Sequence, residues 1–291
     1  MARPGLDGPT AQILALLGSM ASIQVGAALA QRLFPVVGAP GTTALRVGLA
    51  ALILLAIRRP SLKRLDRASW RALGLYGASL GLMNLCFYLA LRTIPLGVAV
   101  AVEFIGPLVV AAASHRSRLD ILWLALAAGG LLLLTPLGGQ ALDPVGLLLA
   151  LAAGVFWGLY IVFGQAAGAI GEGAASALGM AVAALVVLPF GIASAGMRLA
   201  DPALLPLGLT VAVLSSALPY SLEMFALTRL PRTTFGTLMS LEPAIGALSG
   251  LVLLGQHLSL RQGGAIAAII LASAGAAIRF TAAKAKVPPL A

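Results

Sequence analysis

Cysteine and charged residues are both scarce in this sequence. Cys86 is the only cysteine among 291 residues, so no disulfide can form within the chain. Charged residues make up 10% of the chain and hydrophobic residues 60%, a balance far too apolar for a soluble domain. Acidic residues are the rarest charged type, with 9 against 19 basic residues. The composition therefore excludes a soluble, disulfide-stabilised fold and indicates a membrane protein.

Enzyme and nucleic-acid-binding signatures are absent as well. The sequence has no HExxH, CxxC, nucleophile-elbow or Walker motif, and both histidines fall in short predicted loops. The net charge of +10 is not arranged as a basic face with interleaved aromatic residues, which a nucleic-acid-binding protein would need. The first ten residues lack the apolar run of a signal peptide, so we expect none to be removed. We predict no catalytic residue, metal, cofactor or nucleic-acid partner.

Long apolar runs are abundant, and the mean hydropathy of the chain is +1.03. A backbone in hydrocarbon must satisfy its own hydrogen bonds, so runs of about 20 apolar residues are expected to be helices. We predict an all-α integral membrane protein in contact with the lipid bilayer. Its ten predicted transmembrane helices are residues 11–31, 42–57, 71–91, 94–113, 119–136, 144–166, 173–194, 204–227, 232–254 and 262–280.

Basic residues are distributed unevenly among the predicted connections. If the N-terminus is cytoplasmic, fourteen of the 19 Lys and Arg residues fall on the cytoplasmic side and four on the opposite side. Cytoplasmic connections of membrane proteins carry an excess of Lys and Arg. We therefore predict that both termini are cytoplasmic.

The sequence repeats at about half its length. A shift of 136 residues aligns Pro95 with Pro231 and Pro107 with Pro243, without a gap. Five spans in each half is an odd number, so the second half enters the membrane with opposite polarity, and such inverted repeats place substrates near the midplane. The predicted five-helix repeats are residues 1–140 and 141–291.

Four charged residues lie inside predicted spans: Arg46, Glu103, Glu223 and Glu242. Each costs about 2.5–3.5 kcal/mol unless it is paired or faces water. Arg46 and Glu103 either line an aqueous cavity, where they meet a substrate carboxylate and ammonium, or form a buried ion pair between their helices. Glu242 precedes Pro243, which interrupts the helical hydrogen bonds. That carboxylate either serves a cation or proton site or caps local backbone.

Polar and aromatic side chains accompany these charges at helical spacing. Asn84 and Tyr88 share one face of the third span, and Tyr220 shares a face with Glu223 in the eighth. Aromatic and amide groups around a carboxylate suit a zwitterion of amino-acid size. The predicted substrate-binding residues are Arg46, Asn84, Tyr88, Glu103, Trp157, Tyr160, Tyr220, Glu223 and Glu242.

Glycine pairs four residues apart recur along the chain. They occur at Gly77 and Gly81, and the other pairs are Gly154 with Gly158 and Gly246 with Gly250. Such small-xxx-small pairs let helix backbones approach closely in lipid. We predict helix–helix contacts, rather than ligand sites, at all three pairs.

Two stretches resemble a known family of transporters. FYLALRTIPLGVAVAVEFIGPL, at residues 87–108, and LEPAIGALSGLVLLGQHLSL, at residues 241–260, are similar to the EamA form of the drug/metabolite transporter superfamily and, within it, to the threonine/homoserine exporter branch. The resemblance extends over nearly the whole chain. One departure is Gly255-Gln256, where relatives commonly read Gly-Glu after the ninth span.

The resemblance implies a multi-pass carrier of the bacterial inner membrane. Its expected substrates are neutral, hydrophobic or aromatic amino acids, or related small metabolites, exported from the cytoplasm by alternating access. Protons are a candidate coupling ion. The open alternatives are a carrier of another metabolite or drug, a facilitative carrier without proton coupling, and a membrane-embedded enzyme or structural subunit. The sequence does not set the oligomeric state.

Overall fold

Helices form all the regular secondary structure in the part of the chain that the computed structural model describes. The described residues are 9–62, 65–113, 122–123, 125–126, 129–130, 133, 142–219, 222, 226 and 238–284. The α-helices are α1 (Pro9–Ala30), α2 (Phe34–Arg58), α3 (Arg67–Ala90), α4 (Leu96–Glu103), α5 (Ile105–Ala113), α7 (Pro144–Ala167), α8 (Glu172–Ala195), α9 (Leu205–Ala212), α12 (Glu242–Leu254) and α13 (Leu260–Lys284). Short helices are η1 (Gln31–Leu33), η3 (Gly168–Ile170), η4 (Gly196–Ala200), η5 (Pro202–Leu204) and the π-helical η6 (Val213–Ala217).

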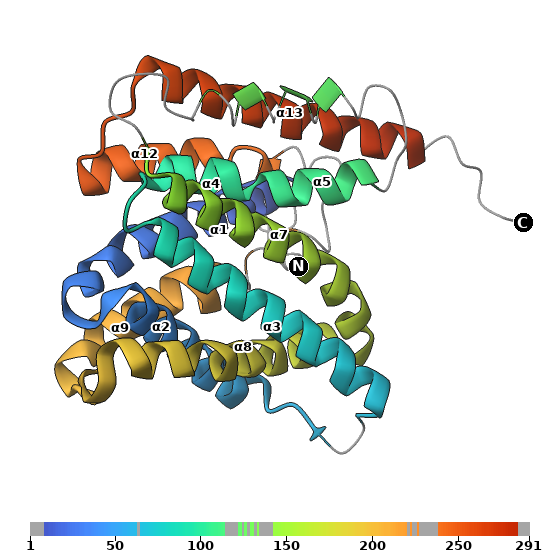
Figure 1. Cartoon of the computed structure of the whole chain (residues 1–291). Helices are drawn as coiled ribbons and strands as arrows, with labels where there is room; N and C mark the ends of the chain where they lie inside the picture. Colours follow the sequence, from blue (N-terminus) through green and yellow to red (C-terminus); the bar gives the residue numbers. More distant parts are fainter. Residues whose placement is uncertain are drawn as a thin grey trace, which may run out of the picture.

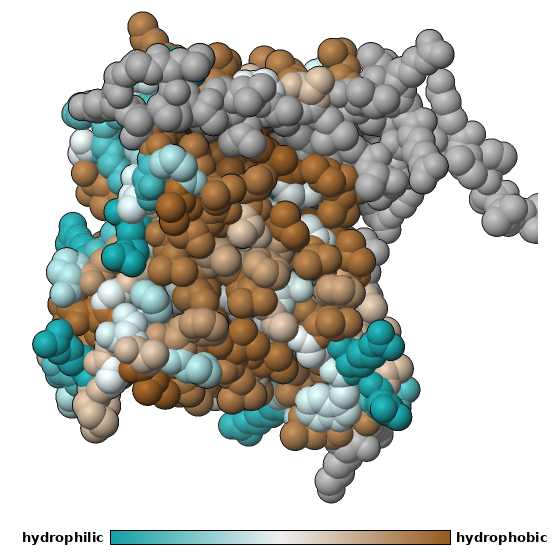
Figure 2. Space-filling model, in the orientation of Figure 1, coloured by the Kyte–Doolittle hydropathy of each residue, from teal (hydrophilic) through white to brown (hydrophobic). Residues whose placement is uncertain are grey.

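The exterior of these helices is apolar. Four described helical segments are long and apolar enough to cross a membrane: Ala11–Arg58, Arg67–Ala90, Pro144–Gly164 and Gly173–Ala200. Large hydrophobic side chains face outward, and Leu52, Leu148 and Leu185 are 64%, 66% and 70% exposed. Figure 2 shows a largely hydrophobic face with hydrophilic residues at its left edge and lower right corner. Such a surface suits surrounding lipid, as predicted for an integral membrane protein. The count of ten spans, the inverted repeat and the orientation stay predictions.

Carboxylates fix the starts of two long helices. Asp66 precedes α3, and its side chain accepts a hydrogen bond from the Ser69 backbone N–H at 2.8 Å. Asp143 precedes α7 and accepts from the N–H groups of Val145 at 3.2 Å and Gly146 at 3.1 Å. These bonds satisfy N–H groups that have no partner inside the helix. Both long helices therefore begin directly after an Asp.

The core surrounds α4, all eight residues of which are buried. Figure 1 shows α4 between α12 and α7, both of which it contacts. Glycines permit these contacts. A Cβ on Gly154 of α7 would lie 2.6 Å from the Glu103 carbonyl oxygen, and one on Gly246 of α12 would lie 3.1 Å from Val100. A Cβ on Gly77 of α3 would similarly lie 2.6 Å from a carbonyl oxygen of α8. The predicted helix contacts at the three glycine pairs are confirmed.

Prolines interrupt the helices of the predicted fourth and eighth spans. We expected a continuous helix over 94–113, which is wrong at Phe104, where a turn separates α4 from α5. Pro107 explains the break, because it has no N–H to donate to the carbonyl of Glu103, four residues earlier, and its ring crowds that carbonyl. The expected helix over 204–227 is also not regular, because it changes to the π-helical η6 after α9.

Candidate substrate site

Arg46 forms the centre of a buried polar group. Its side chain projects from α2 and is 6% exposed. One guanidinium nitrogen donates a hydrogen bond to the Asn84 side-chain oxygen on α3. The other donates to the Ser215 carbonyl at 2.7 Å and to the Ser216 hydroxyl at 3.3 Å, both in η6. Arg46 therefore joins two helices of the predicted first half to the irregular helix of the predicted second half.

The Ser215 carbonyl can accept this bond because of Pro219. In a regular α-helix the N–H of residue 219 would donate to the carbonyl of residue 215, but proline has no N–H. The helix widens here, and the Leu218 N–H donates to the Val213 carbonyl instead. Widened turns of this kind recur at functional sites. A proline in the eighth span thus provides the backbone acceptor for a buried cation.

Tyr88 lies against the same guanidinium. The guanidinium carbon of Arg46 is 5.5 Å from the centre of the Tyr88 ring, a distance suited to a cation–π interaction. Tyr88 is 1% exposed, yet its hydroxyl has no hydrogen-bond partner among the described residues. The same is true of the Arg46 Nε group. A buried polar atom without a partner costs about 1–3 kcal/mol, so both atoms are candidate contacts for a ligand.

The two buried carboxylates occupy helix ends. Glu103 is the last residue of α4 and Glu242 is the first residue of α12, and they are 7% and 5% exposed. The Glu103 carboxylate lies within electrostatic range of both Glu242 and Arg46. In the described parts of the chain, however, no ion pair joins Arg46 to Glu103, and Arg46 bonds to Asn84 and η6 instead. The buried Arg46–Glu103 ion pair of the second alternative is therefore not among the described contacts.

Gln24 of α1 also belongs to this group, although we did not include it among the predicted site residues. Its side-chain nitrogen donates to a Glu242 carboxylate oxygen at 3.4 Å, and Gln24 is 2% exposed. Its own side-chain oxygen has no partner in the described residues. Helix α1 is joined to η6 by the Ser22 hydroxyl, which donates to the Leu214 carbonyl at 2.7 Å. The signal in the sequence was an amide side chain in the middle of an apolar span.

The remaining predicted site residues are distributed more widely. Trp157 of α7 meets Phe104 edge to face at 5.4 Å, directly at the break after Glu103. Tyr160 stacks on Tyr76 at 4.9 Å, in the core between α3, α7 and α8. Tyr220 and Glu223 lie outside the described residues.

An apolar helical fold with charged groups buried where helices break is the architecture of a membrane transporter. The chain belongs to the EamA-like transporter family of the drug/metabolite transporter superfamily, and the family profile matches residues 144–278. The resemblance inferred from the sequence is thus confirmed, as is a transporter rather than an enzyme.

Individual relatives match over most of the chain. The chain is 52% identical over 268 residues to the threonine/homoserine exporter RhtA of Escherichia coli K12, covering 91% of both proteins. It is 53% identical to the exporter of the same name from Salmonella typhimurium LT2, again covering 91% of both. An uncharacterized Pseudomonas aeruginosa protein, PA1977, is 32% identical over 75% of this chain and 77% of its own. One crystal structure of a protein shares the fold, with a TM-score of 0.57 and 21% identity over 92% of this chain and 99% of that one.

Proposed function

We propose that this protein exports small hydroxylated amino acids such as threonine and homoserine from the bacterial cytoplasm across the inner membrane. The identity of 52% to the Escherichia coli threonine/homoserine exporter over 91% of each chain supports this substrate class. This proposed substrate class is narrower than the neutral, hydrophobic or aromatic amino acids that we inferred from the sequence. The structural observation that carries the proposal is the pair of unpartnered polar groups at Arg46 Nε and the Tyr88 hydroxyl.

In the proposed complex, the substrate carboxylate binds Arg46 Nε and the Tyr88 hydroxyl. Both groups donate hydrogen bonds, and a charge-assisted bond to a carboxylate is among the strongest available. The substrate ammonium binds near Glu103 and Glu242, the two carboxylates buried with Arg46. A side-chain hydroxyl then donates to the unpartnered oxygen of Gln24. One zwitterion with a hydroxyl would thus complete several unsatisfied groups at once.

Transport requires this group to open. Arg46, Tyr88, Glu103 and Glu242 are each at least nine-tenths buried, so the conformation described here is closed around them. We propose alternating access by ten helices in two inverted repeats, with α4 and α12 moving relative to α1 and α2. The helix ends at Glu103 and Glu242 give each carboxylate a neighbouring break at which the chain can bend.

Protons are the proposed coupling ion. Glu103 and Glu242 interact electrostatically in a site from which water is largely excluded. Two carboxylates that share a buried site are more stable with one proton between them than with two negative charges. A proton bound there would be exchanged for the substrate ammonium during each cycle.

Counterflow into proteoliposomes tests the proposal. Vesicles preloaded with threonine should accumulate labelled threonine and homoserine, and leucine or phenylalanine should compete poorly. Arg46→Gln, Glu103→Gln and Glu242→Gln should each abolish this uptake, whereas Arg198→Gln in the exposed η4 should leave it intact. Unchanged uptake in all three site variants would refute the site, and lack of threonine uptake by the wild type would refute the substrate.

An imposed pH gradient separates proton coupling from facilitation. Acidification of the side that receives the substrate should drive its uphill movement in the wild type and not in Glu103→Gln. Uptake that follows only the substrate gradient, at any pH difference, would establish the facilitative alternative.

Cysteine labelling tests the orientation. Since Cys86 is the only cysteine, Cys86→Ala provides a cysteine-free background. Leu62→Cys, between α2 and α3, should react with an impermeant maleimide only from the cytoplasmic side, and Met197→Cys in η4 only from outside. Those native side chains are 54% and 87% exposed, so both positions are accessible. The reverse pattern would invert the topology.

A further inference from the structure

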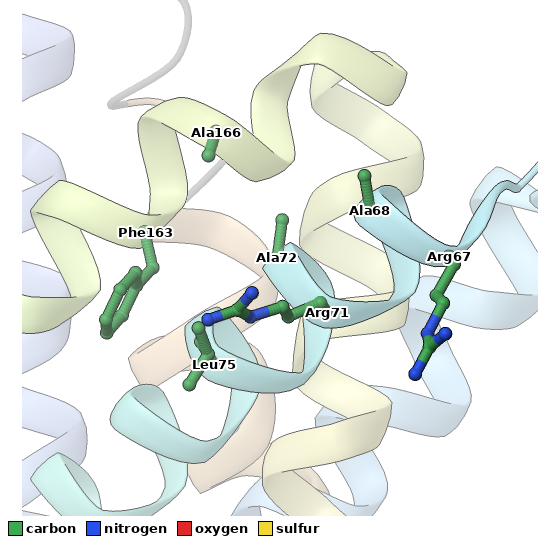
Figure 3. A pocket seen from close by; sticks show the side chains of 7 residues that line it. All are labelled: Arg67, Ala68, Arg71, Ala72, Leu75, Phe163 and Ala166. Carbon is green, nitrogen blue, oxygen red and sulfur yellow. The ribbon is translucent and has the colours of Figure 1, made fainter.

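A surface groove lies between the start of α3 and the end of α7. It has a volume of about 840 Å³, and its walls carry Arg67, Arg71 and Leu75 of α3 and Phe163 of α7, with alanines of both helices between them. Figure 3 shows the Arg71 side chain turned toward Leu75 and Phe163, while Arg67 extends from the first turn of α3. None of these residues is among the predicted substrate-binding residues, and Gln24 is not among them either.

The groove carries two arginines without a carboxylate partner among the described residues. Arg67 and Arg71 are exposed, and neither makes an ion pair or hydrogen bond within the described ranges. The nearest acidic side chain in the sequence, Asp66, is occupied by the Ser69 N–H at the start of α3. The Arg67 guanidinium, at the first turn of α3, and the Arg71 guanidinium, which is turned toward Leu75 and Phe163 (Figure 3), are therefore both available to an anion.

The groove is apolar below the Arg71 side chain (Figure 3). Leu75 is 39% exposed, and the Phe163 ring stands beside it. Trp70, which follows Arg67 by three residues, is 45% exposed. Tryptophan is enriched at the boundary between membrane and water, so α3 crosses that boundary at its first turns. Figures 1 and 2 agree, because the lower right corner, where α3 begins, is hydrophilic and the face above it is hydrophobic.

We propose that this groove binds one anionic phospholipid. The lipid phosphate contacts Arg67 and Arg71 at the membrane surface, and an acyl chain runs along Leu75 and Phe163. Basic pockets at the cytoplasmic edge of transmembrane helices attract anionic headgroups, and the charge count puts this end of α3 in the cytoplasm. A zwitterionic lipid would bring its own cationic headgroup toward the two arginines. Free phosphate would leave the apolar surface of Leu75 and Phe163 uncovered. The charge and the apolar surface together therefore select an anionic lipid.

Native mass spectrometry of the full chain in detergent tests the site directly. Phosphatidylglycerol and phosphatidylethanolamine of the same acyl composition are titrated in parallel, and the dissociation constant of the first bound lipid is measured. We expect clear preference for phosphatidylglycerol. At roughly 1 kcal/mol for each basic residue near the surface, Arg67→Gln with Arg71→Gln should weaken that binding roughly 30-fold.

Matched variants distinguish this site from general charge attraction. Arg67→Lys with Arg71→Lys keeps the charge and should retain most of the binding, whereas Arg59→Gln with Arg198→Gln removes two exposed charges elsewhere and should leave it unchanged. Phe163→Ala should weaken phosphatidylglycerol binding with both arginines in place, and excess inorganic phosphate should not compete. Equal affinity for the two lipids, or undiminished phosphatidylglycerol binding after loss of both arginines, would overturn the proposal. Competition by inorganic phosphate would overturn it in favour of a soluble-anion site.

Discussion

The side-chain oxygen of Gln256 accepts a hydrogen bond from the backbone N–H of Leu96 at 2.9 Å. The two residues are 160 positions apart, so this bond joins the chain after α12 to the first turn of α4. The first N–H groups of any helix lack partners within it. Gln256 thus caps α4 across the two predicted halves.

The first prediction concerns this cap. Gln256→Ala should lower the free energy of unfolding by about 1 kcal/mol, because the Leu96 N–H loses its acceptor. Gln256→Glu should be at least as stable as the wild type, since a carboxylate also accepts the bond and is favoured at a helix N-terminus. Thermal unfolding in detergent measures both. A Glu variant as unstable as the Ala variant would show that acceptance of this bond is not the role of Gln256.

The second prediction concerns the approach of α7 to α4. Gly154→Ala would place a Cβ 2.6 Å from the Glu103 carbonyl oxygen, a backbone atom that cannot move without shifting the helix. Overpacking of this kind costs about 1–3 kcal/mol, and it should also reduce transport by displacing Glu103. Gly74→Ala is the matched control, because a Cβ there has no neighbour within 4 Å. Equal melting temperatures for the two variants would show that the contact with α4 is not tight.

The long apolar helices and several buried polar residues could be predicted from the sequence, for identifiable reasons. A long run of apolar residues predicts a helix that can cross a membrane. The helices α1, α3, α7 and α8 accordingly lie at runs of high hydropathy. Charges inside those runs are costly, so they identify buried polar groups by themselves. Arg46 was predicted on this basis and Asn84 from its helical spacing with Tyr88, and the structure joins the two by a hydrogen bond.

The partners of the charged groups were harder to predict. Arg46 bonds to the Ser215 carbonyl, and every residue has a carbonyl, so nothing in the residue type at 215 marks it as an acceptor. The informative residue was Pro219, four positions later, whose missing N–H leaves that carbonyl available. Pro107 acts similarly on Glu103. These prolines explain where the two helices break, although we predicted continuous helices over 94–113 and 204–227, and pairing a break with a cation required the fold.

The third prediction separates a binding role of Tyr88 from a structural one. The Tyr88 hydroxyl is buried and has no hydrogen-bond partner within the described structure, so Tyr88→Phe removes no bond that stabilises the fold. The melting temperature should stay unchanged or rise. If the hydroxyl donates to the substrate carboxylate, the KM for threonine counterflow should increase about tenfold, the effect of one lost hydrogen bond. An unchanged KM would remove Tyr88 from the substrate site.

The fourth prediction is a pH dependence that originates at Asp143, outside the membrane-spanning helices. Interaction with the Thr93 side chain and the hydrogen bonds from the backbone N–H groups of Val145 and Gly146 hold the pKa of the Asp143 carboxyl below the ordinary value of 3.8. The unfolded chain therefore takes up this proton at a higher pH than the folded protein does. The stabilisation is fully present above pH 3.8 and is lost as the pH falls through the lower pKa of the folded state.

Two variants isolate this titration. Asp143→Asn keeps a side-chain oxygen that can cap α7 but has no proton to gain, so its melting temperature should fall less than that of the wild type between pH 7 and pH ~3. Thr93→Val removes the largest cause of the lowered pKa and should also flatten the difference, while leaving the cap of α7 in place. Melting curves at a series of pH values in one detergent make the comparison. Parallel curves for the wild type and Asp143→Asn would mean that the acid sensitivity arises from other groups, because the charge on Asp143 is the only property of the cap that acid changes.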